Sequence, residues 1–407
     1  MPDADDREEP ARRAARVAAR DSYGRLVAIL SARTRDIAAA EDALSEALAI
    51  ALATWPERGV PENPDAWLLT TARRKGANAR RHEGVAADAL GELELRLTER
   101  QEPTSHVGDE RLSLLFVCAH PAIDESVRTP LMLQTVLGLD AERIGSAFLV
   151  APATMGQRLV RAKAKIKVAG IEFRHPEPEE LADRLHDVLQ GVYAAFGAGW
   201  DDMAQGRGLT DEAIFLGRLL VALLPSEPEP KGLLALMLFC EARREARRDE
   251  DGRFVPLGLQ DAARWSRPMI LEAEALLTRA SEARRFGRFQ CEAAIQSVHA
   301  QRAITGVVQH HALRILYDLL MAHEPSAGVA VSRAAAMVDA GAIDEAEAAL
   351  AQQAPELVER YQPYWVVRAR IAEARGQDRA AREHLTRALG LTEDPAVRRF
   401  LQARLSP

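Results

Sequence analysis

Apolar residues recur at helical spacing along almost the whole chain. Near its N-terminal side, Tyr23, Leu26, Val27 and Leu30 occupy positions i, i+3, i+4 and i+7, which lie on one side of a helix. Alanine, leucine, arginine and glutamate dominate the composition, and these residues favour the helical state. Pattern and composition together predict an all-α fold.

The segments after this stripe predict two further helices. The stretch from Asp36 to Trp55 is mostly apolar with a few acids, and the prolines and the glycine of PERGVPENP predict its end. Asn63 followed by Pro64 is a favourable N-cap and first position for the next helix, which is expected to run to Arg81.

Changes in composition divide the rest of the chain. Residues 82–110 carry eight acidic residues and several glycines, which predicts an acidic linker, partly helical and partly flexible. Helical periodicity resumes near Leu112 and continues to about Val168. PEPEE at 176–180 marks the next boundary, and PSEPEP at 225–230 marks a shorter break.

A repeat of 35 residues lies toward the C-terminal end. Its first copy contains Arg333, Ala334, Gly341, Ala346 and Leu350, which return as Arg368, Ala369, Gly376, Ala381 and Leu385. A period near 34 that combines a helix, a glycine turn and a second helix is typical of tetratricopeptide units. We therefore expect tetratricopeptide-like repeats near 327–392, with each glycine ending the first helix of its pair.

The chain is acidic overall, with a formal net charge of −7 over 407 residues. Its three cysteines, Cys118, Cys240 and Cys291, are far apart, so neither a disulfide framework nor a zinc site is predicted. The segment MPDADDREEP has acids where a secretory signal would be basic, and the longest apolar runs are too short to span a bilayer. These features predict a soluble, cytoplasmic protein that does not contact a membrane.

Positive charge is nevertheless concentrated in one short segment of this acidic chain. The predicted third helix carries five basic residues and no acid between positions 73 and 81, namely Arg73, Arg74, Lys75, Arg80 and Arg81. Such a cluster is typical of a solvated helix end, where cations favour the helix dipole, or of a nucleic-acid contact.

Residues 141–167 show the layout of a helix-turn-helix. Gly145 is small enough for two helices to approach, a turn at Ala151–Pro152 separates them, and an apolar stripe lines the inner side of the second helix. That stripe consists of Met155, Leu159, Ala162 and Ile166. The outer side is expected to carry Thr154, Gln157, Arg158, Arg161, Lys163, Lys165 and Lys167. These residue types suit a helix in the major groove of DNA, and a solvated surface helix is the alternative interpretation.

In this order the segments resemble an extracytoplasmic-function (ECF) type sigma factor of bacterial RNA polymerase, of the subgroup with a long C-terminal extension. The resemblance is carried by AEDALSEALAIALATWP, NPDAWLLTTARRKGANARR, RLSLLFVCAHPAI and AFLVAPATMGQRLVRAKAKI. HPEPEELADRLHDVL and ARGQDRAAREHLTRALGL resemble the extension. The resemblance implies a region 2-like bundle at 15–81, the acidic linker at 82–110, a region 4-like helix-turn-helix domain at 111–175 and a helical extension at 181–407.

The resemblance also implies roles for individual residues. Asp36, Glu41, Asp42 and Glu46 resemble the part that docks on the clamp of core RNA polymerase. The helix after the 55–64 loop resembles the part that opens the −10 element, with Arg73, Arg74, Lys75, Asn78, Arg80 and Arg81 at the DNA. The helix-turn-helix would read the −35 element through Thr154, Gln157, Arg158, Arg161, Lys163 and Lys165. Gly76, Ala77 and Asn78 depart from the bulkier residues and the aspartate that are usual there.

Enzymatic activity, a cofactor and a metal are not expected. The chain contains no phosphate loop, nucleophile elbow or His-Glu zinc helix, and Cys118 with His120 lacks the two further ligands that zinc requires. The expected partners are core RNA polymerase, promoter DNA and a protein partner of the extension. Two other classes are left open: a DNA-binding regulator that acts without polymerase, and a repeat scaffold without affinity for duplex DNA. Both DNA-binding regions are expected to fold without the residues beyond Pro176, and 181–407 is expected to form one body.

Overall fold

The computed structural model describes Arg13 and residues 22–82, 110–148, 150–174, 176–201 and 207–406. These residues form helices and connecting loops, with a single isolated bridge between Arg248 and Phe254 in the described part, so the predicted all-α class is confirmed. The chain divides into two compact units, Met1–Leu216 and Gly217–Pro407. No helix within the described ranges combines the length and apolar character needed to cross a membrane.

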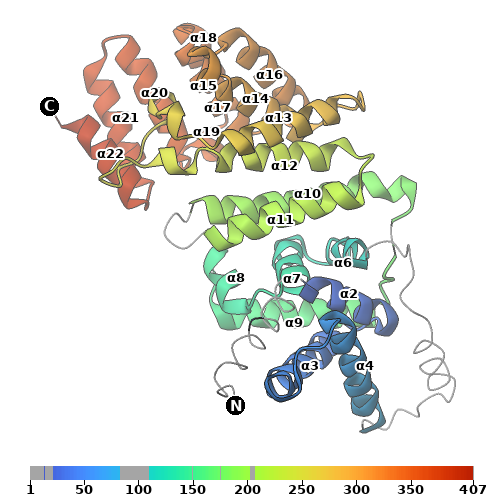
Figure 1. Ribbon diagram of the computed structural model, residues 1–407. Coiled ribbons are helices and arrows are strands. Elements are labelled where there is room, and N and C mark those ends of the chain that lie inside the picture. Colours follow the sequence, from blue (N-terminus) through green and yellow to red (C-terminus); the bar gives the residue numbers. More distant parts are fainter. Residues whose placement is uncertain are drawn as a thin grey trace. The chain divides into compact units, whose positions relative to one another are not determined.

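The first unit contains the N-terminal helices, drawn from blue to green in Figure 1. They are α2 Tyr23–Thr34, α3 Ile37–Arg58, α4 Pro64–His82, α6 Glu110–Cys118, α7 Glu125–Leu137, α8 Ala141–Ala147, α9 Pro152–Val168 and α10 Pro178–Asp201. Helix α11, Arg207–Leu223, begins in the first unit and ends in the second.

The caps of α3 and α4 follow from their sequences. The Asp36 carboxylate accepts a hydrogen bond from the Ala39 amide at 3.1 Å, and the Asn63 side chain accepts one from the Ala66 amide at 3.0 Å. The expected end of α3 near Trp55 is wrong, because the helix continues through Pro56 to Arg58. A proline removes only one hydrogen bond, which the last turn tolerates, and the chain leaves the helix at Gly59 with a φ of 85°.

Helices α6 and α7 lie between α2 on one side and α10 on the other (Figure 1). The predicted stripe of α2 is buried here, with Leu26, Val27 and Leu30 almost inaccessible to solvent. On the opposite side, the Arg128 guanidinium of α7 lies 2.8 Å from the Asp187 carboxylate of α10. Apolar side chains of α10 are buried along the same side: Leu185, Val188, Leu189, Val192 and Phe196. The first compact unit therefore extends well beyond the boundary expected at 176–180.

The second unit is built around α12, Pro228–Glu241, which packs against α13 and α14. Nearly every residue of α12 is buried, as expected for a helix that is apolar all round and covered by its neighbours. The other helices of this unit are α13 Arg267–Ser281, α14 Arg288–Ala300, α15 Arg302–Thr305, α16 His310–His323, α17 Ala327–Asp339, α18 Ile343–Ala351, α19 Pro355–Val358, α20 Gln362–Ala374, α21 Asp378–Gly390 and α22 Pro395–Leu405. Short 3-10 turns at Arg244–Arg247, Leu257–Leu259 and Ala262–Arg264 join α12 to α13.

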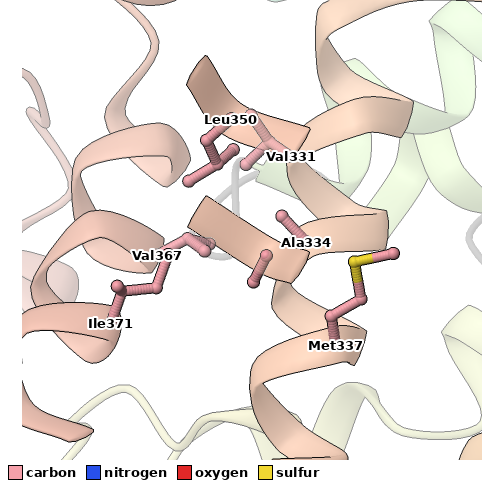
Figure 2. Close-up of a cluster of buried hydrophobic side chains, with 7 residues drawn as sticks. Val331, Ala334, Met337, Leu350, Val367 and Ile371 are labelled. Atoms are coloured by element: carbon pink, nitrogen blue, oxygen red, sulfur yellow. The ribbon is translucent and has the colours of Figure 1, made fainter. Parts of the chain in front are cut away.

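The repeated segments form two helix–turn–helix pairs, α17 with α18 and α20 with α21. Gly341 and Gly376 follow the first helix of each pair with φ angles of 79° and 67°, which confirms their predicted role as helix terminators. Figure 2 shows the core that joins the first pair to α20. Its buried members are Val331, Ala334, Met337, Ala346, Leu350, Val367 and Ile371.

Candidate nucleic-acid and polymerase interface

Helices α8 and α9 meet at the short turn that the sequence predicts. A Cβ atom placed on Gly145 would lie 2.6 Å from the Val150 carbonyl oxygen, so only a glycine allows this approach. The inner stripe of α9 is confirmed, since Met155, Leu159 and Ile166 are almost fully buried. The turn therefore fixes α9 with one side in the core and the other side free to meet a partner.

The exposed side of α9 carries most of the residues expected to contact DNA. Thr154, Gln157, Arg161 and Lys165 are exposed and follow one another at steps of three or four residues, which places them on one face. Arg158 is partly buried at the edge of this face. The arrangement presents an amide, two cations and a hydroxyl along one side of the helix, and these groups can pair with base edges and phosphates.

Lys163 does not lie on the exposed side of α9, so the expected exposure of this residue is wrong. Its side chain is only 9% exposed, and its ammonium group lies 2.5 Å from the Glu41 carboxylate of α3. The position is four residues after Leu159 and three before Ile166, which places Lys163 on the buried stripe rather than opposite to it. The spacing alone therefore predicts that Lys163 is buried. Lys163 is expected on the exposed side only because a lysine is charged.

A second ion pair joins α9 to the start of α3. The Lys167 ammonium group lies 2.6 Å from the Asp36 carboxylate. Burial alone would raise the pKa of Asp36, but the hydrogen bonds from Lys167 and the Ala39 amide outweigh it and lower the pKa. For Glu41, burial outweighs the attraction of Lys163 and raises the pKa of the carboxyl.

The structure therefore separates the four acids expected to face polymerase into two groups. Asp36 and Glu41 are engaged by α9. Asp42 and Glu46 lie on the exposed side of α3, one turn apart, and Glu46 forms a solvent-exposed pair with Lys75 of α4 at 3.3 Å. An acidic surface thus remains accessible on α3, although it is smaller than the sequence indicated.

The basic segment of α4 is only partly open to solvent. Arg74 is exposed and Lys75 partly exposed, whereas burial and the nearby Arg33 lower the pKa of the half-buried Arg73. The backbone of Asn78, Arg80 and Arg81 belongs to the last turns of α4, and their side chains fall outside the described part of the structure. Residues 83–109, most of the expected acidic linker, also lie outside it.

An aromatic pair fixes α4 against α3. The rings of Trp55 and Trp67 meet edge to face, with centroids 5.5 Å apart at an interplanar angle of 66°. Trp55 is buried and Trp67 is partly buried, so Trp67 contributes to packing.

The Cys118 and His120 side chains take part in local hydrogen bonds. The Cys118 sulfur is buried 3.3 Å from the Thr135 hydroxyl, and burial raises the pKa of its thiol to about 12. The His120 Nδ1 atom accepts a hydrogen bond from the Ala122 amide at 3.1 Å. Within the described ranges, no group of three or more His, Cys, Asp and Glu residues is placed to hold a metal ion.

Residues 19–85, which include α2, α3 and α4, match the sigma-70 region 2 family, and this match supports a sigma factor. Residues 184–281 match a family of unknown function, DUF6596. The chain belongs to one family with an uncharacterized protein of Rhizobium meliloti (strain 1021), to which it is 36% identical over 384 residues. The alignment covers 91% of this chain and 90% of that protein. No solved structure matches the chain.

Proposed function

We propose that the chain is an ECF-type sigma factor that binds core RNA polymerase and directs promoter recognition and transcription initiation. The observation that carries this proposal is the sigma-70 region 2 match over the segment that folds into an acidic α3 packed against a basic α4. A helix pair with a polar exposed face, α8 and α9, follows in the same compact unit. Transcription initiation requires such a protein to contact polymerase, a role proposed for α3, and to contact DNA, a role proposed for α4 and α9.

In this proposal α3 docks on the polymerase clamp through its acids. Asp42 and Glu46 are exposed and share one face, so they are the first charges that a basic surface would meet. Long-range attraction between such surfaces raises the association rate and fixes the orientation of the two partners.

The proposed role of α4 is to hold the opened −10 element. A single DNA strand is held by cations along its backbone and by flat side chains against its bases. Arg74 and Lys75 are the accessible cations of the described part of α4, and Asn78, Arg80 and Arg81 continue the same helix. Trp55 and Trp67 give that helix a fixed position on α3.

The proposed role of α9 is to read the −35 element in the major groove. Arg161 and Gln157 are suited to base edges, and Lys165 and Thr154 are suited to phosphates. Because these four side chains share the exposed side, one approach of the helix to the groove brings them all to the DNA.

The second unit is proposed to be a tetratricopeptide-like domain that binds a protein and regulates the sigma unit. Its helix pairs pack in series, and such arrays commonly present an extended surface to peptides or proteins.

The proposal is tested by run-off transcription with purified core RNA polymerase on a library of genomic fragments. Transcripts that require both the protein and core enzyme, and that share −10 and −35 elements, are the expected result. A protein that binds duplex DNA equally well with and without core enzyme and starts no transcript would instead be a polymerase-independent regulator. A protein with no affinity for DNA in either condition would be a scaffold.

A further inference from the structure

The Arg243 guanidinium, just beyond the C-terminal end of α12, is buried without a negative partner. The residue is only 8% exposed. Its Nε atom donates a hydrogen bond to the Phe239 carbonyl oxygen at 3.2 Å, and its Nη2 atom donates one to the Gln296 side-chain oxygen at 2.7 Å. Within the described residues, no carboxylate forms an ion pair with Arg243. Its hydrogen bonds therefore go to neutral groups only.

Neutral partners compensate only part of the cost of burying this charge. Transfer of a cation out of water costs several kcal/mol, and hydrogen bonds to uncharged acceptors return a fraction of that. The carbonyl end of α12 offers a partial negative charge, equivalent to about half an elementary charge. The Cys240 sulfur lies 3.6 Å from the Nη2 atom, but burial raises the pKa of this thiol and keeps it neutral. An anion would complete the environment of Arg243.

A polar stripe of α14 lies beside the guanidinium. Glu292, Gln296 and His299 follow one another at steps of four and three residues, so they share one side of the helix. All three are partly exposed, whereas the neighbouring side of α14 is apolar and forms a core with α16. Because α14 packs against both α12 and α16, this stripe faces groups from more than one helix.

Tyr317 of α16 adds a hydroxyl group to the same cluster. Its ring packs against the core between α14 and α16. Burial, and then the charges of Glu292 and Asp339, raise the pKa of this hydroxyl to about 12 against the opposing effect of Arg243, so it stays a neutral donor. Neither the hydroxyl nor the Arg243 Nη1 atom has a hydrogen-bond partner among the described residues, and neither is sealed off from solvent. The cluster thus holds two free donors, one of them charged.

A second arginine adds to the positive charge around His299. Burial, and then Arg243, lower the pKa of His299 to about 4, and Arg302 acts in the same direction. Arg302 donates to two backbone carbonyl oxygens of the segment between α12 and α13, at 2.6 Å and 2.8 Å, and meets no carboxylate in the described ranges. Two guanidinium groups without acidic partners therefore flank one neutral imidazole.

The acids near this cluster limit the charge of the ligand that it suits. Glu292 and Asp339 act on Tyr317, and they pair with Arg288 and Arg370. They balance those arginines and repel a second negative charge on a ligand, so a monoanion is favoured over a dianion such as hydrogen phosphate. A carboxylate is a monoanion with two oxygens, which can accept hydrogen bonds from a guanidinium and a hydroxyl at the same time.

We propose that Arg243 and Tyr317 form a binding site for a carboxylate group in the second unit, with Gln296 holding the guanidinium in position. One carboxylate oxygen accepts a hydrogen bond from the Arg243 Nη1 atom, and the other accepts one from the Tyr317 hydroxyl. A small free acid and the C-terminal end of a peptide present the same group. The inference concerns residues of the second unit only and does not depend on the role proposed for the first.

Calorimetric titration of the full chain at constant ionic strength tests the site. The probes are acetate, N-acetyltrialanine, N-acetyltrialanine amide and inorganic phosphate. N-acetyltrialanine should bind saturably, and its amide, which lacks the carboxylate, should not bind. Equal affinities for acetate and the peptide support a free acid as the ligand, and tighter binding of the peptide supports a chain end. Failure of both carboxylates to bind, or tighter binding of phosphate than of either, would overturn the proposal.

A matched pair of tyrosine variants locates the binding. Tyr317→Phe removes only a hydroxyl that has no partner within the described residues, so the variant should fold normally. Its affinity for the bound carboxylate should fall at least about tenfold, because a hydrogen bond to a charged group is lost. Tyr361→Phe is the control at another partly buried tyrosine, whose pKa is raised by burial and not by the charges of the cluster. Equal affinities for the two variants would contradict the assignment of Tyr317.

Arg243→Gln removes the charge and should abolish binding of the carboxylate. If this variant does not fold, Tyr317→Phe decides the question. Because the titration contains no polymerase, its outcome is separate from that of the transcription assay. A chain that directs transcription but binds no carboxylate loses this site and keeps the proposed function, and a chain that binds the carboxylate but starts no transcript keeps the site and loses that function.

Discussion

The Arg248 guanidinium lies 2.8 Å from the Asp394 carboxylate, although 146 residues separate them in the chain. Asp394 also caps α22 by accepting hydrogen bonds from the Ala396 and Val397 amides. Burial alone would raise its pKa, but Arg248 and the two amides outweigh burial and lower it. The segment after α12 is thereby tied to the last helix, and residues 217–407 form one compact unit. The repeats thus pack on the helices before them. The compact unit that contains them begins at Gly217, whereas the sequence predicts one body over 181–407.

Replacement of this cap should destabilise the second unit. Asp394→Ala removes a helix cap and leaves Arg248 without its carboxylate, so we expect the free energy of unfolding to fall by roughly 2 kcal/mol. Asp378→Ala is the matched control, because Asp378 is exposed in the first turn of α21 and is not its N-cap. Urea unfolding of the full chain measures both, and equal losses would contradict the role of Asp394.

Arg161→Ala should weaken recognition of the −35 element without unfolding the protein. Arg161 lies on the exposed side of α9, and an arginine that contacts a base is worth about 1–3 kcal/mol of discrimination. Arg158→Ala should have a smaller effect, because Arg158 is partly buried. Binding of promoter DNA by the complex with core enzyme gives the comparison. Arg174→Ala, an exposed arginine outside α9, is the control and should bind normally.

Reversal of Asp42 and Glu46 to lysine should lower the affinity for core enzyme. These residues share one exposed face of α3, so the change places two positive charges where a basic surface is proposed to dock. Glu57→Lys is a control at an exposed acid near the end of the same helix. A pull-down in which the double variant retains wild-type affinity would rule out this docking face.

Truncated fragments should show whether the first unit ends near Leu216, as in the structure, or at the boundary near 176–180 that the sequence predicts. A fragment of residues 1–176 lacks α10, whose buried apolar side chains cover α6 and α7. Loss of that burial should cost roughly 5 kcal/mol, so this fragment should melt far below a fragment of residues 1–226. This packing is at odds with the expectation that both DNA-binding regions fold without the residues beyond Pro176. Equal melting temperatures would restore that expectation.

Acidification should destabilise the second unit through His299. Burial, and then the charge of Arg243, lower the pKa of His299 to about 4, with smaller effects from Asp339, Arg302 and His310. In the unfolded chain the His299 imidazole binds a proton near pH 6.5, whereas in the folded chain it binds one only near pH 4. The free energy of unfolding is therefore highest above about pH 7 and decreases as the pH falls from 6.5 to 4. From pH 7 to 5 the wild type should lose about 2 kcal/mol more than His299→Gln. Unfolding titrations at both pH values measure the difference.

Much of the fold could be predicted because its signals are local. Asn63 and Asp36 cap their helices through side chains only three residues away, and Gly341 and Gly376 end helices through their own backbone angles. The partner of Lys163 could not be predicted in this way. Helical periodicity shows which side of α9 is apolar, but it does not show that the acid covering its edge is 122 residues away.

The boundaries of the two compact units also cannot be predicted from local sequence signals. The prolines near 176–180 mark a real break between α9 and α10, but they do not show which helices α10 packs against. That depends on apolar surfaces far apart in the chain, such as the site where Gly191 meets Thr129 and Met132.

The match to DUF6596 begins at residue 184, inside α10, and α10 belongs to the core of the first unit. The boundary between sequence families and the boundary between compact units therefore fall at different places. A fusion that joined residues 1–183 to a different extension at this family boundary would lack most of the helix that covers α6 and α7. Such a fusion has to inherit α10 or supply another helix in its place.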